Sequence, residues 1–532
     1  MIKNRFLQRH KAIFALIALT AVAKLFGVVC EMPDGSLLNL GEFVGADAFY
    51  EKGIYGQGAN VANLELYVVF PEEEPEYAIF LKDSNYTTYH PESTTERYGS
   101  VHPYETLSIM AGYNSDYENQ EVSTGMAIRA EYVSGQVGKN SLFADDRTIM
   151  QTYEKFFSNG TDVISSSWKD DGSGAFMCGA VLDSYAFKTP GTVFVGAAAN
   201  DGESGPGYVS SPYKNMNVIS VGALDDKTNF KTVADTSSYG PNDFYNPVSG
   251  AIVKSVVSAV DIVAPGRVYT VQRDGTVGNG SGTSFAAPMV SSVVALMISY
   301  SREFAMDPAS RDARLIKAVL LNSAAKIEGW NNGASIIDSV NVNGRVYDGV
   351  YSTAQSLDYG SGAGALNAAE ALVQYERFAK TSFLDSVQNG ESHFYDFYID
   401  NAGVAFSATL CWFLGNDVAE ITYGTDGNIS AVDAGMSYFA NLDLRLWYVG
   451  EDENLLIAQS VSEYNNVEHL FLELAEAGAY KLEVSFEDLV YGHSESETYG
   501  IAWSMAQIPE PSIYAALFSG MALIFAASRR RG

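Results

Sequence analysis

The sequence predicts an α/β fold, a parallel sheet flanked by helices, followed by an antiparallel β-sandwich and a hydrophobic C-terminal helix. Three observations predict it. Short apolar runs alternate with helix-like segments between about residues 41 and 376, apolar and polar residues alternate one by one after about residue 385, and the chain ends in an apolar run. The chain has 532 residues, which exceeds a single compact core, so a division into domains is expected.

Strand-like and helix-like segments follow one another through the first region. Runs that end in polar or glycine-rich loops predict strands at 61–69, 161–168, 191–200 and 217–224. Helical patterns lie at 105–112, 146–157, 284–301 and 313–325. This alternation favours a parallel sheet covered on both faces, in which functional residues gather at the carboxyl ends of strands. We assign residues 41–376 to this domain.

The second region has the period of a half-buried strand. Apolar side chains alternate with polar ones in LDLRLWYV (442–449) and YKLEVSF (480–486), and Gly and Asn turns separate such runs. This pattern predicts an antiparallel β-sandwich over residues 385–505, with the domain boundary within KTSFLDSVQNGES (380–392).

Both ends of the chain carry targeting features. Basic residues, the apolar run AIFALIALTAVA and a small-x-small site predict a signal peptide over residues 1–23. Residues 508–532 combine the triplet Pro509-Glu510-Pro511, an apolar run and three terminal arginines. This combination resembles the PEP-CTERM sorting signal of exopolysaccharide-producing bacteria; a plain C-terminal membrane helix is the alternative. We expect an exported protein of the cell envelope or exterior, anchored in the inner membrane before sorting.

Charge and cysteine content limit the function classes. The formal net charge of −31 argues against nucleic-acid binding, which needs clustered Lys and Arg. The three cysteines, Cys30, Cys178 and Cys411, have no close spacing. A Cys178–Cys411 disulfide stays open, but unpaired buried thiols are favoured.

One serine has an unusual setting. In GNGSGTSFAAPMVSSVVALMIS (278–299), Ser284 follows a glycine-rich stretch and opens an almost wholly apolar helix. A flexible turn before a core helix is the ordinary interpretation. A nucleophilic serine would need a base, an acid that orients the base, and donors for an oxyanion.

Histidines are scarce, so the search for a base is short. Of six, one lies in the predicted signal peptide and three in or beside the sandwich region: His10, His393, His469 and His493. His90 lies in a polar stretch without a regular pattern, whereas His102 opens a segment with one apolar helical face. Scarcity and position favour His102.

These residues resemble those of the subtilases, the subtilisin-like serine peptidases. Residues 282–288, GTSFAAP, match the serine motif G-T-S-x-A-x-P at every fixed position. The histidine motif is in frame, since Ala111 and Gly112 fall nine and ten residues after His102, but Pro103 and Tyr104 replace its usual Gly and Thr. Two further family stretches, SPYKNMNVISVGAL and DIVAPG, follow in the right order, so the resemblance covers roughly residues 41–376.

The resemblance implies the other site residues. It assigns an oxyanion donor to Asn200, beside the N–H of Ser284 at the positive end of its helix. It places Ser167, Trp168, Gly196 and Ala197 along the substrate cleft. The family usually has a small glycine-rich segment where Trp168 and Lys169 stand, so a narrower or altered first pocket is expected.

The acid departs from the family pattern. Where subtilases have Asp after the first strand, this chain has Glu65. A glutamate can accept the imidazole N–H, although its extra methylene requires a shift of strand or ring by about a bond length. Asp83 and the group Glu72–Glu74 are poorer candidates, since no strand positions them; the acidic run 71–76 is better explained as a solvated loop.

The predicted function is a secreted serine endopeptidase that forms an acyl-enzyme on Ser284, with His102 as general base and Glu65 in place of the usual Asp. An esterase with a nucleophile elbow at 282–286 would order its triad as serine, acid, histidine, which this chain does not. A weak or inactive peptide-binding relative remains the alternative.

The resemblance also sets expectations for partners and cofactors. We expect a polypeptide substrate, the C-terminal sorting machinery, a membrane contacted through the C-terminal helix, no nucleic acid, and a monomer. The chemistry requires no cofactor. Structural calcium is common in the family, but the sequence has no ligand loop specific enough to assign.

Overall fold

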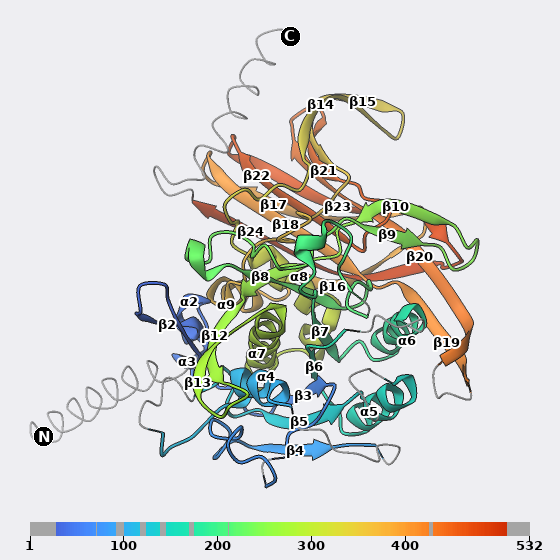
Figure 1. Ribbon diagram of the computed structural model, residues 1–532. Coiled ribbons are helices and arrows are strands. Elements are labelled where there is room, and N and C mark those ends of the chain that lie inside the picture. Colours follow the sequence, from blue (N-terminus) through green and yellow to red (C-terminus); the bar gives the residue numbers. More distant parts are fainter. Residues whose placement is uncertain are drawn as a thin grey trace, which may run out of the picture.

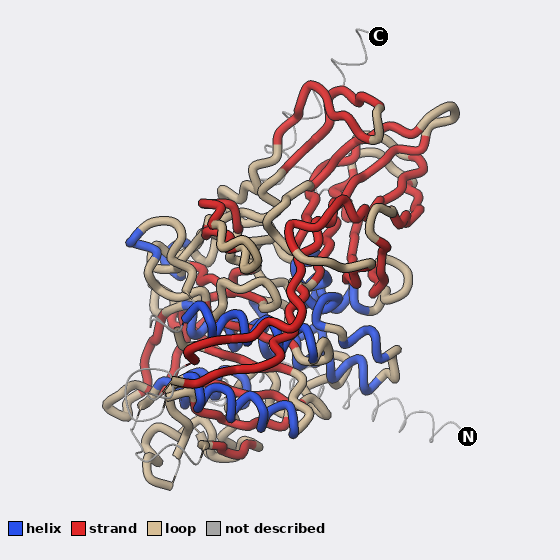
Figure 2. Tube along the Cα trace, turned by 90° about the vertical axis from the view of Figure 1, so that its right-hand side faces the viewer, coloured by secondary structure: helices blue, strands red, loops and turns tan. Residues whose placement is uncertain are grey.

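The computed structural model describes residues 28–70, 72–91, 100–117, 124–138, 145–169, 175–210, 212–424 and 429–507. The predicted signal peptide (1–23) and the predicted sorting segment (508–532) lie outside the described residues. Helices and a parallel sheet occupy one half of the molecule, and antiparallel sheets occupy the other (Figure 2).

The first half is built on a seven-stranded sheet in the order β11-β8-β7-β6-β3-β5-β4, in which every pairing is parallel (Figure 1). Its strands are β3 (Asn60–Glu65), β4 (Tyr86–Tyr89), β5 (Glu131–Gln136), β6 (Val163–Ser166), β7 (Val193–Ala197), β8 (Ile219–Leu224) and β11 (Ile262–Pro265). The predicted fold class is confirmed.

Helices cover both faces of this sheet. One face carries α4 (His102–Ala111), α7 (Thr283–Glu303), α8 (Ala313–Ser323) and α9 (Ala368–Tyr375), and the other α5 (Asp146–Ser158) and α6 (Ala175–Lys188). Successive strand residues point to opposite faces. Val61 and Val163 therefore pack under α7, whereas Ala62 and Ile164 pack under α5. Burial on both faces explains why these strands read as continuous apolar runs.

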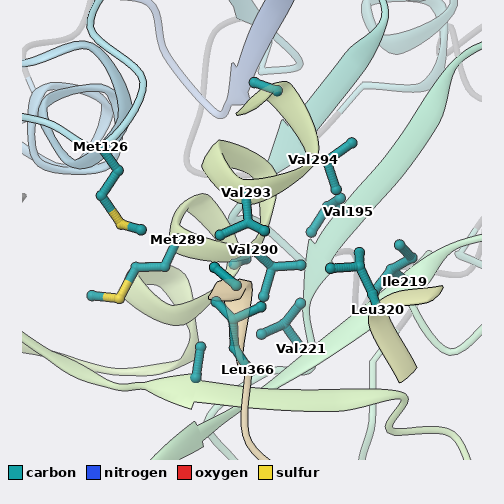
Figure 3. Close-up of a cluster of buried hydrophobic side chains, with 14 of the residues drawn as sticks. Met126, Val195, Ile219, Val221, Met289, Val290, Val293, Val294, Leu320 and Leu366 are labelled. Atoms are coloured by element: carbon teal, nitrogen blue, oxygen red, sulfur yellow. The ribbon is translucent and has the colours of Figure 1, made fainter. Parts of the chain in front are cut away.

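Helix α7 is the central helix of the core. Figure 3 shows its Val290, Val293 and Val294 against Val195 of β7 and Val221 of β8. Among the described residues it is the one helix with the length and composition of a membrane span, but 94% of its apolar window is buried inside the protein. Its apolar character therefore belongs to the core of the fold.

The second half consists of two sheets that share a buried cluster. The larger has the order β14-β15-β21-β20-β23-β17, with β19 also on β20, and the smaller the order β16-β24-β18-β22. All of these pairings are antiparallel except β15 with β21. The cluster joins Leu444 and Val484 of the larger sheet to Phe406 and Leu410 of the smaller. The strands are β14 (Ser335–Val342), β15 (Arg345–Thr353), β16 (Ser382–Gln388), β17 (Ser392–Ile399), β18 (Val404–Trp412), β19 (Gly415–Tyr423), β20 (Ile429–Val449), β21 (Asn454–Ser460), β22 (Val467–Leu474), β23 (Gly478–Tyr491) and β24 (Ser496–Gln507).

The hairpin β14–β15 comes from the first region of the sequence but pairs with the second. Its Tyr347 ring meets the ring of Trp447 edge-on at 5.2 Å, beside Val342 and Val350. Part of the outer face of the larger sheet is therefore covered. Asp443 and Arg445, which alternate with the core leucines, are buried too and form an ion pair of 2.6 Å. The segment 380–392, where we place the domain boundary, contains strand β16; the domain limits stay predictions.

The two halves are in close contact. Helix α8 packs against β18 and β24, where a Cβ on Gly500 would lie 2.5 Å from backbone atoms of Arg314. Nearby, the Lys326 ammonium is buried 2.8 Å from Nε2 of His469 in β22. The long hairpin β19–β20 reaches down along α6 (Figure 1), where Asn416 donates to the carbonyl of Ala180. The C-terminal sheets are thus integrated with the helical layer.

The remaining elements are short. They are β1 (Val29–Glu31), β2 (Leu37–Asn39), α2 (Leu40–Phe43), α3 (Asp47–Tyr50), β9 (Asn242–Tyr245), β10 (Ile252–Val257), β12 (Arg267–Val271), β13 (Val277–Ser281) and the 3₁₀ turns η1 (Gly202–Ser204), η2 (Asp226–Thr228) and η3 (Pro308–Arg311). The backbone N–H of Glu31 in β1 donates to Oδ1 of Asn279 in β13, and Asn279 Nδ2 donates back to Oε2 of Glu31, both at 3.2 Å. Cys30 and Cys411 are free and buried; the side chain of Cys178 lies outside what the structure describes.

Candidate functional site

His102 and Glu65 meet where a strand and a helix of the first half come together. His102 is the first residue of α4, and Pro103 suits the first turn because its missing N–H would have no helical partner there. Glu65 is the last residue of β3. Its Oε2 lies 3.0 Å from Nδ1 of His102. Asn63 fixes the same helix on the same strand, since its amide donates to the carbonyl of Pro103 and to Thr106 Oγ1.

The charge of Glu65 acts on a partly exposed imidazole. The Glu65 side chain is 2% exposed and that of His102 34%. Burial lowers the pKa of His102, but the charge and hydrogen bond of Glu65, with a smaller contribution from Glu105, outweigh it and raise the pKa above 6.5. Oε1 of Glu65 has no hydrogen-bond partner within the described residues. The carboxylate is thus oriented on the ring by one bond.

Ser284 lies at a backbone turn between a strand and a buried helix. Strand β13 ends at Ser281, Gly282 adopts φ +145° as the N-cap, and α7 begins at Thr283. Ser284 is half-buried while the helix residues after it are buried. The hydroxyl of Ser167, which follows β6, donates to the Ser284 carbonyl at 2.9 Å. The glycine-rich stretch before Ser284 is therefore part of strand β13, and Ser167 holds the first turn of α7, in place of the flexible turn of the ordinary interpretation.

Asn200 is oriented by the same turn. Its Oδ1 accepts from the N–H of Thr283 at 2.9 Å and from the Thr283 hydroxyl at 3.1 Å. Nδ2 and Oδ1 both lie 3.2 Å from where a Cβ of Gly282 would be. Ala199, one residue before, has φ +87°, a conformation that is unfavourable for alanine. The backbone therefore turns sharply after β7. Asn200 itself is exposed.

The structure brings these side chains to one edge of the sheet. The ring of Phe285, next to Ser284, lies 6.1 Å from the ring of His102, and α4 packs on α7. The hydrogen bonds of the described residues do not include one between His102 and Ser284. Such catalytic bonds are often long without substrate and shorten in the complex. The described contacts join Glu65 to His102 and Asn200 to the turn that carries Ser284.

The residues expected along the substrate cleft differ in their packing and partners. Trp168 is 4% exposed and meets the ring of Tyr213 edge-on at 5.9 Å. A Cβ on Gly196 would lie 2.0 Å from the same ring, so glycine is required there. Ala197 is buried. Lys169 forms an ion pair of 2.8 Å with Asp201.

The rejected candidates have other partners. Asp83 accepts from the N–H and hydroxyl of Ser115. Glu74 accepts from the Tyr104 hydroxyl at 2.8 Å. His90 lies 6.1 Å from the ring of Phe70. None of these bonds involves His102.

Two side chains near the site escaped sequence reasoning. Asn63 looks like an ordinary polar position in a strand, and its burial at 1% is visible only after folding. Glu105 looks like a polar residue on a helix surface, yet it is 8% exposed. Its position three residues after His102 was the one available signal.

The described part of the chain holds no group of three or more His, Cys, Asp or Glu side chains suited to a metal ion. The structural calcium that the family resemblance makes possible stays unassigned.

Comparison with known proteins agrees with this arrangement. Residues 61–362 match the model of the subtilase family (peptidase S8). The chain belongs to the subtilase family. Subtilases are serine endopeptidases that act on polypeptides, need no cofactor for catalysis and are mostly secreted, and this chain is placed among them.

The relatives match about half of this subtilase. Thermitase of Thermoactinomyces vulgaris is 28% identical over 245 residues, which cover 45% of this chain and 74% of thermitase. Pyrolysin of Pyrococcus furiosus is 29% identical over 298 residues, 49% of this chain but 21% of pyrolysin. Among solved structures, the prenylagaramide maturation protease PagA is 21% identical with a TM-score of 0.43, over 62% of this chain and 98% of PagA.

Proposed function

We propose that this subtilase hydrolyses peptide bonds through an acyl-enzyme on Ser284, with Glu65 as the acid of its triad. His102 takes the Ser284 proton as the hydroxyl oxygen attacks the scissile carbonyl, and returns it to the leaving amine. A water molecule, deprotonated by His102 in the same way, then attacks the acyl-enzyme and releases the carboxylic acid product. Glu65 fixes the tautomer of the ring and stabilises the imidazolium. The observation that supports this most is the 3.0 Å contact between Glu65 Oε2 and His102 Nδ1.

The oxyanion would be bound by two donors. Asn200 offers Nδ2, because its Oδ1 is occupied by Thr283. The N–H of Ser284 is the other, at the start of α7, where the helix dipole favours negative charge. Donors held in this way need no rearrangement when the charge forms.

The test is fluorophosphonate labelling of the full chain, with the adduct mapped by mass spectrometry. We expect one adduct on Ser284, lost in His102→Ala and retained in Ser281→Ala, which removes an exposed hydroxyl just before the turn. Absence of an adduct in the unmodified chain would favour the alternative, a peptide-binding module that has kept the fold.

We also propose that residues 1–23 are a signal peptide for export and that residues 508–532 are a sorting signal. The support is the sequence of residues 1–23 and 508–532. Expression in an exporting host, followed by sequencing of the mature N-terminus and fractionation of the cell, tests this. An intact residue 1 in the cytoplasmic fraction would contradict it.

A further inference from the structure

The segment 212–217 lies between the two halves of the molecule. Its Tyr213 belongs to a buried cluster of the parallel sheet that also contains Trp168. Its Met216 packs instead against the buried cluster of the C-terminal sheets. The chain then enters strand β8 at Ile219. This short segment therefore contacts a residue expected along the substrate cleft at one end and the C-terminal sheets at the other.

Asn217 ends the segment and pairs with the backbone of the C-terminal half. Its Oδ1 accepts from the N–H of Leu414 at 2.7 Å, and its Nδ2 donates to the Leu414 carbonyl at 2.8 Å. Two residues of an antiparallel ladder exchange the same pair of bonds, so the Asn217 amide takes the part of a neighbouring strand here. Asn217 is 4% exposed, and an alanine in its place would leave both backbone groups without these partners.

Other hydrogen bonds hold the same end of the segment. The amide of Asn466, just before β22, donates to the carbonyl of Met216 at 2.8 Å and to that of Trp412 at 2.6 Å. The N–H of Asn217 donates to Oδ1 of Asp183 at 3.0 Å, and its Nδ2 donates to the Asp183 carbonyl, also at 3.0 Å. Asp183 is a buried residue of α6. The C-terminal half and α6 together fix this end.

The other end of the segment reaches the residues beside Ser284. The ring of Tyr213 meets the ring of Trp168 edge-on at 5.9 Å, and a Cβ on Gly196 would lie 2.0 Å from the Tyr213 ring. Ser167, the residue before Trp168, donates its hydroxyl to the Ser284 carbonyl at 2.9 Å. Contacts therefore run from the C-terminal sheets through this segment to the turn that carries the proposed nucleophile.

We propose that Asn217 is a positioning residue through which the C-terminal sheets fix one wall of the substrate cleft. The proposal rests on the function proposed above, since Trp168 and Gly196 border a cleft only if Ser284 is the nucleophile. Tyr213 contacts both of these residues, so its position affects theirs. A wall held in one place discriminates between substrate side chains by shape, whereas a wall that can move admits more of them. Asn217 acts through Tyr213 and does not touch the substrate.

The experiment measures kcat/KM of the full chain for peptides that differ in the residue before the scissile bond. In Asn217→Ala we expect the ratio between the best and the poorest peptide to fall about tenfold. Rates are divided by the fraction of chain that a fluorophosphonate labels, because unfolding lowers that fraction but leaves the ratio unchanged. Asn416→Ala is the matched control. Asn416 is 6% exposed and its amide donates to Ala180 of α6 across the same interface, so the ratio should stay as it is.

An unchanged ratio in Asn217→Ala, or an equal change in Asn416→Ala, would overturn the proposal. If Asn217→Ala does not fold, Asn466→Ala, which frees the Met216 carbonyl, replaces it with the same two outcomes. Failure of the proposed function gives a different result, namely no cleavage of any peptide by the unmodified chain.

The exposure of Trp168 then decides the proposal independently of activity. Its fluorescence is the difference between chains with and without Trp168→Phe, and acrylamide should quench it little in the unmodified chain, where Trp168 is 4% exposed. Quenching that rises in Asn217→Ala and not in Asn416→Ala supports the proposal. Equal quenching in the unmodified chain and Asn217→Ala overturns it.

Discussion

At the scale of single residues, Glu65 is the side chain that binds the ring of His102. It ends strand β3 and reaches the ring of His102 at 3.0 Å, buried to 2% of its side-chain surface. Helix α4 is also anchored to β3 by Asn63, which donates to the Pro103 carbonyl and to Thr106. Strand, acid and helix therefore act as one unit.

Replacement of this acid tests that unit. In Glu65→Gln the amide can still occupy the site, but it no longer stabilises the imidazolium or fixes the tautomer, so we expect kcat to fall roughly 10²–10⁴-fold. Glu131→Gln, at an exposed glutamate that begins the neighbouring strand β5, should leave kcat unchanged. Turnover of a peptide substrate measures both. A Glu65→Gln variant with full kcat would exclude Glu65 as the orienting acid.

Sequence reasoning reached Glu65, His102, Asn200 and Ser284 because each stands in a recognisable stretch of chain, and the structure brings their surroundings together. Glu105 could not be predicted in the same way. Whether a helical glutamate is solvated depends on what packs over it in the folded chain, and Glu105 is 8% exposed. Burial of this kind is a property of the folded chain.

At the scale of elements, the contact between α8 and β24 depends on a glycine. A Cβ on Gly500 would lie 2.5 Å from the carbonyl carbon and oxygen of Arg314, which are backbone atoms that cannot rotate away. Glycine is therefore needed for the close approach of strand and helix.

Gly500→Ala should accordingly lower Tm, with a loss of about 1–3 kcal/mol in the free energy of unfolding. The matched control is Gly191→Ala, where an added Cβ would meet nothing within 4 Å. Thermal unfolding of both variants measures this difference in Tm. Equal stability of the two would mean that strand and helix can separate without cost.

The positions of several helices could be predicted from the sequence, whereas some strands and strand pairings could not. The periods of 146–157, 284–301 and 313–325 predicted α5, α7 and α8 closely. The hairpin β12–β13 was not predicted, since Val277–Ser281 carries four polar or glycine residues and lacks the alternation of a half-buried strand. The pairing of β14–β15 with β21 also escaped, because no local pattern identifies a distant partner strand.

At the scale of the whole molecule, a buried cation lies between the two halves. Lys326 donates to the carbonyl of Ala363, contacts Nε2 of His469 and lies over the rings of Trp330 and Phe471. Burial lowers the pKa of Lys326 to about 7, with the charge of Asp358 opposing. The ammonium is therefore less favourable in the folded chain than in the unfolded one.

The lowered pKa of Lys326 makes the free energy of unfolding depend on pH. Between about pH 7 and 10.5 the unfolded chain binds a proton at Lys326 that the folded chain lacks, so this group makes the free energy of unfolding rise with pH, by at most about 1.4 kcal/mol per unit. Unfolding of the unmodified chain and of Lys326→Met from pH 7 to 10 measures it. The stability difference should move in favour of the unmodified chain as pH rises, and a flat difference would contradict a perturbed Lys326.

The reciprocal bonds between Glu31 and Asn279 link the first described strand to the segment that leads into Ser284. Cleavage within the hairpin β1–β2 would remove these bonds. Loss of this hairpin would release strand β13, which leads into the proposed nucleophile Ser284. Proteolysis near the amino terminus would therefore impair catalysis early. The resistance of residues 28–39 to proteolysis would then limit the working life of the enzyme.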